Sequence, residues 1–194
     1  MTATTLWLVR HAPTRDNVDE IIMGQRDPEA IVEGLDGAGH LFRGTTFAHV
    51  VSSDARRAQA TARAIAAGHP LRLDERLRER SFGAWEGRPK TELRAAHPEV
   101  LTDTGAVRLD ADIPELEPLS AFFARVHGAL ADLAALGASE SPLLVVGHNG
   151  SLRVAMVLLG VSDLESAANT SLPHLRPVQA DLAQLRSPAS ALAG

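Results

Sequence analysis

Short apolar runs alternate along the chain with segments in which apolar residues recur at helical spacing. Runs too short for a helix predict buried strands at 6–9, 47–53 and 143–146, with a shorter alternating run at 71–73. Helical spacing predicts helices at 55–67, 88–96, 119–136 and 151–159. Strands that alternate with helices in this way predict an α/β fold, a three-layer α/β/α sandwich around a mostly parallel central sheet.

Three stretches lack a clear period. Residues 14–44 are rich in Gly, Asp and Arg, and we expect a loop followed by a short helix. Residues 97–119 contain three prolines and six acidic residues, which indicates an excursion over the surface that acts as a lid or selects the substrate. Residues 169–186 are expected to form one or two edge strands before a loose tail. No linker divides the chain, so one domain is expected over residues 1–194.

Polar residues at the ends of buried strands are the first functional signal. Arg10 and His11 follow the first strand, and His148 follows the strand at 143–146. Arg57 lies in the first turn of the helix that follows the second strand, and the cap of that helix is expected to be Ser52, Ser53 or Asp54. Because open α/β sheets bind ligands at the carboxyl ends of their strands, we expect Arg10, His11, Arg57 and His148 to lie together.

The chemistry of these four side chains suits one phosphate group. An arginine is a permanent cation whose planar fork matches phosphate oxygens. The charge of Arg10 disfavours protonation of His11, which leaves a neutral imidazole available as a nucleophile. Backbone amides at the start of the helix after His148 are able to bind an anion as well. The alternative is that Arg57 is simply solvated and that His148 is a helix cap.

Composition narrows the range of functions. The chain of 194 residues has no cysteine, which excludes thiolate catalysis and cysteine zinc sites. Its net charge of −5 argues against nucleic acid as a partner. No basic leader and no apolar run of membrane length is present, so a cytoplasmic protein without membrane contact is expected. Most arginines lie in the N-terminal half, which indicates a small anionic ligand or merely reflects genome composition.

Four sequence blocks, in order, resemble the signature of the histidine phosphatase superfamily, which has the phosphoglycerate mutase-like fold, across nearly the full chain. They are LVRHAPT at 8–14, SSDARRAQATA at 52–62, LRERSFGAWEG at 77–87 and VVGHNGSLR at 145–153. Beside the two histidines the chain departs from the family pattern, because Ala12 and Asn149 stand where glycine is usual. Both substitutions are expected to narrow the pocket without removing a catalytic group.

The resemblance implies a reaction and a role for each site residue. His11 attacks phosphorus and forms a phosphohistidine, and Glu79 protonates the leaving alcohol and then activates water. The phosphoryl oxygens are held by Arg10, Arg57 (not Arg56), His148 and Asn17. Asn149 is expected to border the substrate. The segment 97–119, with Phe82 and Trp85, is expected to form the wall that selects the alcohol.

The implied function is metal-independent hydrolysis of a small phosphorylated metabolite, with no cofactor. A metal site of His11 and His148 with Asp16 or Asp19 lacks the usual ligand spacing. A phosphoglycerate mutase is the alternative within the fold, but the region between Glu79 and His148 is short and its excursion holds only Arg108 as a cation. Such a site should hold a bisphosphate poorly, which favours a hydrolase. A catalytically silent protein that binds a phosphate ligand is the alternative from another class.

Overall fold

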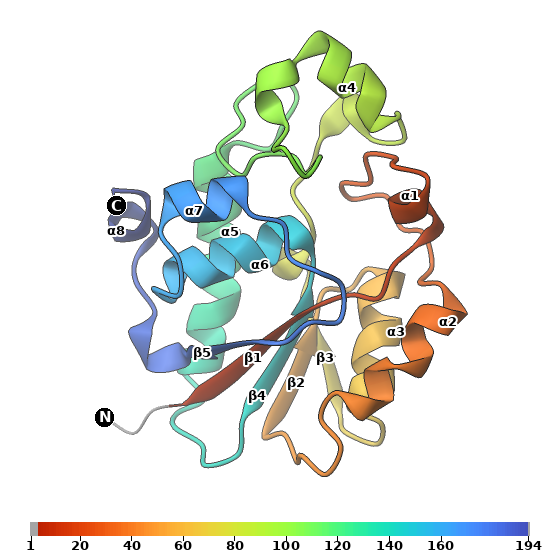
Figure 1. The fold of residues 1–194 in the computed structure, drawn as a ribbon. Coiled ribbons are helices and arrows are strands. Elements are labelled where there is room, and N and C mark those ends of the chain that lie inside the picture. Colours follow the sequence, from red (N-terminus) through yellow and green to blue (C-terminus); the bar gives the residue numbers. More distant parts are fainter. Residues whose placement is uncertain (1–3, 194) are drawn as a thin grey trace.

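A five-stranded sheet forms the centre of the molecule, in a computed structural model that describes residues 4–193. The strand order is β3-β2-β4-β1-β5 (Figure 1). The strands are β1 (Thr5–Arg10), β2 (His49–Ser52), β3 (Leu71–Leu73), β4 (Leu143–Gly147) and β5 (Val178–Asp181). All neighbours pair in parallel except β5, which is antiparallel to β1 at one edge. The predicted mostly parallel sheet is therefore confirmed.

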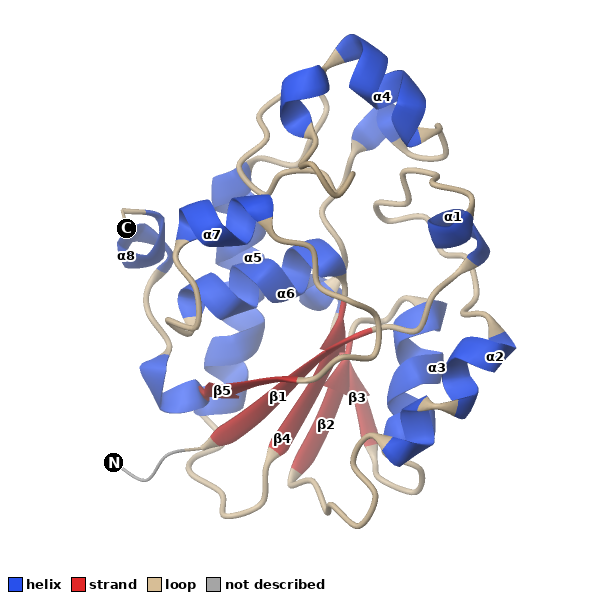
Figure 2. Ribbon diagram, viewed as in Figure 1, coloured by secondary structure: helices blue, strands red, loops and turns tan. Residues whose placement is uncertain are grey.

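Helices cover both faces of this sheet (Figure 2). One face packs against α3 (Arg56–Ile65), which α2 (Val32–Asp36) contacts in turn. The other face packs against α5 (Leu119–Ala134) and α6 (Asn149–Leu158), and both of these contact α8 (Pro188–Leu192). Alternate residues of a strand point to opposite faces, so Val146 joins the core under α3 whereas Val145 joins the core under α5 and α6. Burial on both faces explains the uninterrupted apolar runs. The predicted three-layer sandwich is confirmed.

A third group of elements lies beyond the carboxyl ends of the parallel strands (Figure 1). It contains α1 (Arg15–Val18), α4 (Lys90–Ala96), α7 (Leu164–Asn169) and the segment 97–118. This segment has a small core of its own, in which Leu93 of α4 packs with Val100 and Ile113. The predicted excursion therefore has a packed interior despite its lack of periodicity.

Two local predictions were wrong, the loose tail after residue 186 and the side-chain cap of the helix after β2. The tail forms the helix α8, which starts at the side-chain cap Ser187, and the helix α7, for which no element was predicted, starts at the cap Asp163. The helix α3 starts at Ala55 without a side-chain cap. The hydroxyl of Ser53 lies 2.9 Å from His148 Nε2, and Asp54 accepts a hydrogen bond of 2.7 Å from Arg78 Nε. The expected capping groups are thus engaged elsewhere.

Among residues 4–193, no helix combines the length and the apolar character needed to cross a membrane.

Candidate active site

The register of the two central strands brings His11 and His148 side by side. Arg10 on β1 is the partner of Gly147 on β4, so the next residue of each strand is a histidine at the same edge. The ring centroids lie 5.1 Å apart with an interplanar angle of 58°. Both side chains are buried, with 3% and 1% of their surface exposed. The structure therefore places these two histidines next to each other, as the sequence predicted.

His11 presents an unprotonated ring nitrogen. Its Nδ1 lies 2.6 Å from the carbonyl oxygen of Ala12, and a carbonyl can only accept, so Nδ1 carries the proton and Nε2 the lone pair. Burial, followed by the charges of Arg57 and Arg10, holds the pKa of His11 well below its usual value. The ring is therefore neutral at pH 7 and able to act as a nucleophile.

Arg57 and Arg10 stand beside His11 with donors to spare. Arg57 is 1% exposed and donates to the carbonyl oxygens of Arg26 (2.7 Å) and Gly24 (3.2 Å). Arg10 donates to the Leu172 carbonyl at 2.5 Å. Burial lowers the pKa of Arg10 to about 10, which still leaves it charged at neutral pH. Arg56, by contrast, faces solvent and pairs with Asp27 and Glu29, so it does not take part in the site.

Three buried nitrogens of this group have no hydrogen-bond partner among the described residues: Arg10 Nε, Arg57 Nε and His148 Nδ1. A buried donor without a partner costs free energy, on the order of 1–3 kcal/mol each. Native proteins retain such groups mainly where a ligand or a water completes them. Three together around one neutral histidine describe a site built for an anion.

Glu79 is the nearest carboxylate, and two backbone amides fix its position. Oε1 accepts from the amide of Arg80 and Oε2 from the amide of Gly150, each at 2.9 Å. A Cβ on Gly150 would lie 2.1 Å from Glu79 Oε1, so only glycine allows this approach. The Gly150 amide at the start of α6, which we expected to bind an anion directly, thus holds Glu79 instead.

Arg125 of α5 fixes the backbone around Glu79. Its guanidinium donates to the carbonyl oxygens of Arg76 and Arg78 at 2.7 Å and to that of Glu79 at 2.9 Å. The same side chain pairs with Glu117 at 2.7 Å. The long helix that the sequence predicted as packing alone therefore also positions the carboxylate, a role that the apolar periodicity gave no means of predicting.

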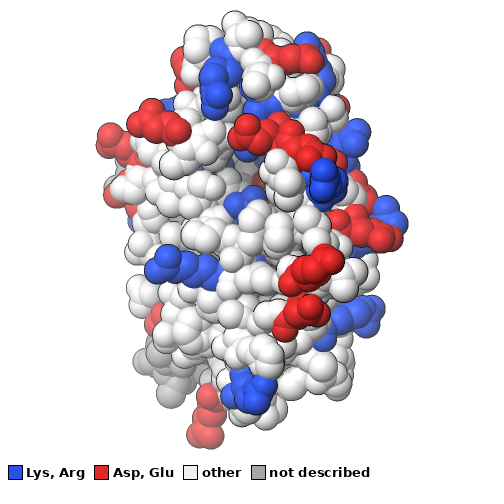
Figure 3. All heavy atoms as spheres, turned by 45° about the vertical axis from the view of Figure 1, so that its right-hand side comes forward, with Lys and Arg blue, Asp and Glu red and all other residues white. Residues whose placement is uncertain are grey.

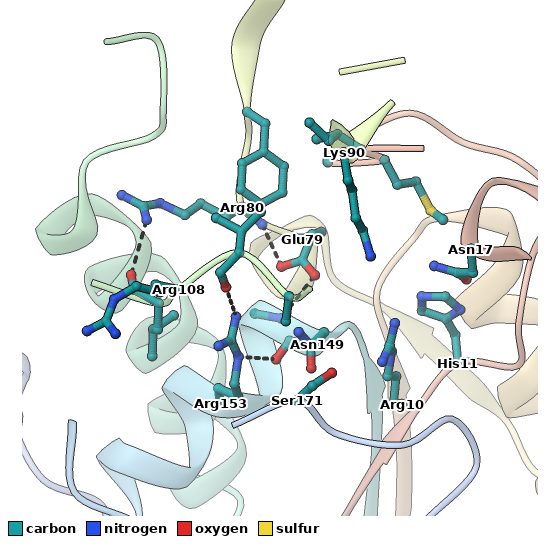
Figure 4. Close-up of a pocket in the computed structure, with 18 of the residues that line it drawn as sticks. Arg10, His11, Asn17, Glu79, Arg80, Lys90, Arg108, Asn149, Arg153 and Ser171 are labelled. Carbon is teal, nitrogen blue, oxygen red and sulfur yellow. Dashed lines mark hydrogen bonds between the residues drawn. The ribbon is translucent and has the colours of Figure 1, made fainter. Parts of the chain in front are cut away.

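A cavity of about 240 Å³ opens onto this group. Of the predicted residues, it is lined by Arg57 and by five that Figure 4 labels, Arg10, His11, Asn17, Glu79 and Asn149. His148 borders a smaller cavity of about 120 Å³, which shares Arg57 and Glu79 with the first. Figure 3 shows atoms of Lys or Arg residues inside a hollow near the centre of the face that it draws. Acidic and basic residues are both scattered over the surface around this hollow.

The two asparagines differ in what they offer a ligand. Asn17 Oδ1 accepts from the amide and the hydroxyl of Thr14, so its NH₂ group is left to face the cavity. Asn149 Oδ1 accepts from the amide of Leu172 at 2.8 Å, which ties a distant loop to the site. Ala12 does not line the cavity, and its buried methyl group lies close to Gly34. The prediction that Ala12 narrows the pocket was therefore wrong.

The cavity holds more cations than the sequence suggested, and the prediction of a site poor in cations was wrong. Arg80 and Arg153 are buried lining residues, and each donates to several carbonyl oxygens. Their bonds to Leu109, Ala111 and Val107 tie the segment 97–118 to the body. This segment contributes residues 104 and 106–109 to the cavity wall.

Lys90 lines the cavity without a partner for its ammonium group among the described residues. Its ammonium group makes no hydrogen bond or ion pair within residues 4–193, whereas Arg108 pairs with Asp110 at 2.8 Å. Figure 4 shows Lys90 directed into the cavity between Glu79 and Arg10. Burial, with the charge of Arg10, lowers the pKa of Lys90. As the only lysine in the chain it was visible in the sequence, but nothing there indicated its direction.

Of the two aromatic residues in the predicted wall, only one lines the cavity. Phe82 lines the cavity, whereas Trp85 does not and packs edge-on against His97 at 5.7 Å. Among the described residues, no group of three or more His, Asp or Glu side chains is arranged to hold a metal ion.

Comparison with known proteins gives consistent matches. The model of the histidine phosphatase superfamily (branch 1) matches residues 6–181. A relative from Hydrogenobacter thermophilus, named as a phosphoserine phosphatase, is 33% identical over 174 residues, which cover 87% of this chain and 85% of that protein. A relative from Enterobacter sp. (strain 638), named as a phosphoglycerate mutase, is 35% identical over 72% of this chain and 67% of its own length. The structure of a mycobacterial glucosyl-3-phosphoglycerate phosphatase with VO₃ superposes with a TM-score of 0.77 and 28% identity, covering 91% of this chain and 90% of that one.

Proposed function

The chain belongs to the histidine phosphatase superfamily (branch 1), and on this premise we propose that it hydrolyses a small phosphomonoester through a phosphohistidine, without a metal ion. One observation carries the proposal: three buried nitrogens without a partner surround a neutral histidine. Donors aimed at a phosphoryl group supply the charge stabilisation that many phosphoryl-transfer enzymes take from magnesium.

In the first step, His11 Nε2 attacks phosphorus while the bond from phosphorus to the ester oxygen breaks. Glu79 gives its proton to the departing alkoxide, so that the alcohol leaves neutral. The phosphohistidine ring becomes positively charged, and the Ala12 carbonyl at 2.6 Å from Nδ1 stabilises that charge. Arg10, Arg57 and His148 donate to the oxygens of the transferred group.

In the second step, Glu79 takes a proton from a water molecule that attacks the phosphohistidine. The bond from phosphorus to Nε2 breaks, inorganic phosphate is released and His11 returns to its neutral form. Glu79 ends the cycle protonated, as it began. The proton balance therefore needs no other group.

Phosphate release from a panel of phosphomonoesters, with excess EDTA present, tests this proposal. Steady turnover that survives chelation is the expected result. Loss of turnover on chelation, restored by a divalent cation, would contradict the metal-independent mechanism. No release from any ester would favour the silent binding protein.

A phosphoglycerate mutase remains the second candidate, because Lys90 adds a free cation to the cavity. The named mutase among the relatives points the same way. Conversion of 3- to 2-phosphoglycerate without phosphate release would establish this alternative over the hydrolase.

The unpaired ammonium group of Lys90 should favour substrates that carry a second negative charge. For a phosphomonoester with a carboxylate, Lys90→Met is expected to raise KM about 10-fold, because a charged hydrogen bond contributes roughly 1.5–3 kcal/mol. The kcat should change little, and an ester of a neutral alcohol should keep its KM. Arg94→Met, on an exposed part of α4, removes the same charge and is the matched control. Equal KM changes for both substrates would rule out this role for Lys90.

A further inference from the structure

His174 lies on a loop that crosses the carboxyl end of β1, between α7 and β5. The loop is held there by three hydrogen bonds to the site: Leu175 N to the Arg10 carbonyl (3.1 Å), His174 Nδ1 to the His11 carbonyl (2.7 Å), and Leu172 N to Asn149 (2.8 Å). Leu175 has φ +57°, a left-handed conformation that costs a leucine free energy. Strain of this kind is retained where it presents a neighbouring side chain to a site.

The contact with His11 fixes the tautomer of His174. A carbonyl oxygen can only accept, so Nδ1 carries the proton and Nε2 keeps its lone pair. Burial and the charge of Arg10 lower the pKa of His174 to about 4, so the ring is neutral at pH 7. Nε2 makes no hydrogen bond within residues 4–193, and it is not fully buried, so a ligand is able to reach it. It is thus a free acceptor.

This free acceptor borders the phosphoryl end of the cavity. His174 lines the cavity, and its ring centroid lies 5.2 Å from that of His11, at 64°. Figure 4 shows Ser171, from the same loop, beside Arg10 at the cavity. The Ser171 hydroxyl also makes no hydrogen bond within the described residues, so this side of the cavity offers two unused hydrogen-bonding groups close to the reacting atoms.

A free acceptor needs a donor from the ligand, since a phosphate dianion has none to offer. Among the other side chains at the cavity, Glu79 already receives two amides and the Oδ1 of Asn149 receives one, whereas the Ser171 hydroxyl is able to donate as well as accept. An ammonium group of the ligand is disfavoured, because Arg10 and Lys90 place positive charge nearby. A hydroxyl group is the donor that fits.

We propose that His174 is a specificity-determining residue whose Nε2 accepts a hydrogen bond from a hydroxyl of the substrate's alcohol, close to the phosphoryl group. The substrate is then a phosphorylated polyol rather than a simple alkyl phosphate. The inference rests on the proposed phosphatase function and concerns which ester that function takes.

The test compares two esters that differ only in their hydroxyls, glycerol 2-phosphate and propan-2-yl phosphate. The wild-type protein should prefer glycerol 2-phosphate by about 10-fold in kcat/KM, the value of about one well-placed hydrogen bond. O-phosphoethanolamine against ethyl phosphate serves as the ammonium comparison, and no preference is expected there. p-Nitrophenyl phosphate reports whether the enzyme is active at all.

Two variants separate recognition from support of the loop. In His174→Asn the amide NH₂ replaces the Nδ1 donor and the Nε2 acceptor is lost, so the preference should fall to within about twofold. In His174→Gln the amide oxygen reaches the position of Nε2, so most of the preference should persist although the bond to His11 is lost. His49→Asn and His49→Gln, at an exposed histidine, are the matched controls. Because the readout is a ratio, a general loss of activity does not affect it.

Several results would overturn the inference. They are a wild-type ratio near one, equal ratios in wild type and His174→Asn, a greater loss of preference in His174→Gln than in His174→Asn, or a preference for the ammonium ester. Absent turnover of both test esters by an enzyme that hydrolyses p-nitrophenyl phosphate would also overturn it. If no ester is hydrolysed, the proposed function itself has failed, and the two failures are thereby distinguished.

Discussion

His11→Ala is expected to reduce turnover by at least about 10⁴-fold, because no other group can take the place of the attacking nitrogen. His148 is the nearest imidazole, but its Nε2 lies 2.9 Å from the Ser53 hydroxyl and its other nitrogen is assigned to the phosphoryl oxygens. The next imidazole, His174, has its ring centroid 5.2 Å from that of His11, and its Nε2 is proposed to bind the alcohol part of the substrate. A water molecule would have to attack the ester directly, without the covalent intermediate. Steady-state kinetics with p-nitrophenyl phosphate measures the loss.

Two further readouts show that the His11 variant has lost its nucleophile and not its fold. Inorganic phosphate should still bind, as measured by calorimetry, because Arg10, Arg57 and His148 remain. Labelled substrate should mark the wild-type protein after an alkaline quench, under which phosphohistidine survives, and should not mark His11→Ala. His49→Ala, at an exposed histidine on β2, is the matched control. Turnover close to that of wild type would refute the assignment of His11.

Glu79→Gln is expected to slow alkyl phosphates by about 10²–10³-fold and aryl phosphates far less. An alkoxide is a poor leaving group that needs the proton of Glu79, whereas p-nitrophenolate departs without one. Both carboxylate oxygens accept backbone amides, so the NH₂ of glutamine would oppose one of those donors. This misfit should lower kcat/KM for all substrates by the same factor. The ratio of kcat/KM between aryl and alkyl phosphates therefore shows whether Glu79 is the acid that protonates the leaving group.

The measurement for Glu79 is the dependence of kcat/KM on the pKa of the leaving alcohol, over a series of aryl and alkyl phosphates. The variant should show a steeper dependence than wild type. Glu86→Gln is the matched control, because Glu86 accepts amides in the same loop and does not line the cavity. Parallel lines for wild type and Glu79→Gln would show that Glu79 is not the acid.

Much of the fold could be predicted from periodicity alone. The central strands are buried on both faces and so keep uninterrupted apolar runs, and α5 keeps its apolar stripe because one side packs on the sheet. Periodicity did not predict the short helices α7 and α8, because their six and five residues are too few to show a helical period. Their polar caps were the available signal.

The cap of α3 shows why local rules fail near a site. Ser53 and Asp54 have the side chains that commonly cap a helix, yet one contacts His148 and the other binds Arg78. Residues far apart in the sequence compete for the same side chain, and only the fold decides which of them prevails. The cap was lost where functional contacts took precedence.

The sequence by itself determined which groups end the central strands and what their chemistry allows. It also distinguished Arg57 from Arg56 through the resemblance to a family signature. Only the tertiary structure decided which of the many cations remain free: Arg80, Arg108 and Arg153 are satisfied by protein acceptors, whereas Lys90 is not. Likewise, only the fold brings His174 to His11, 163 residues earlier in the chain. The sequence states which side chain stands at each position. The partners of that side chain, and which of its hydrogen-bonding groups stay free, depend on segments that come together only when the chain folds.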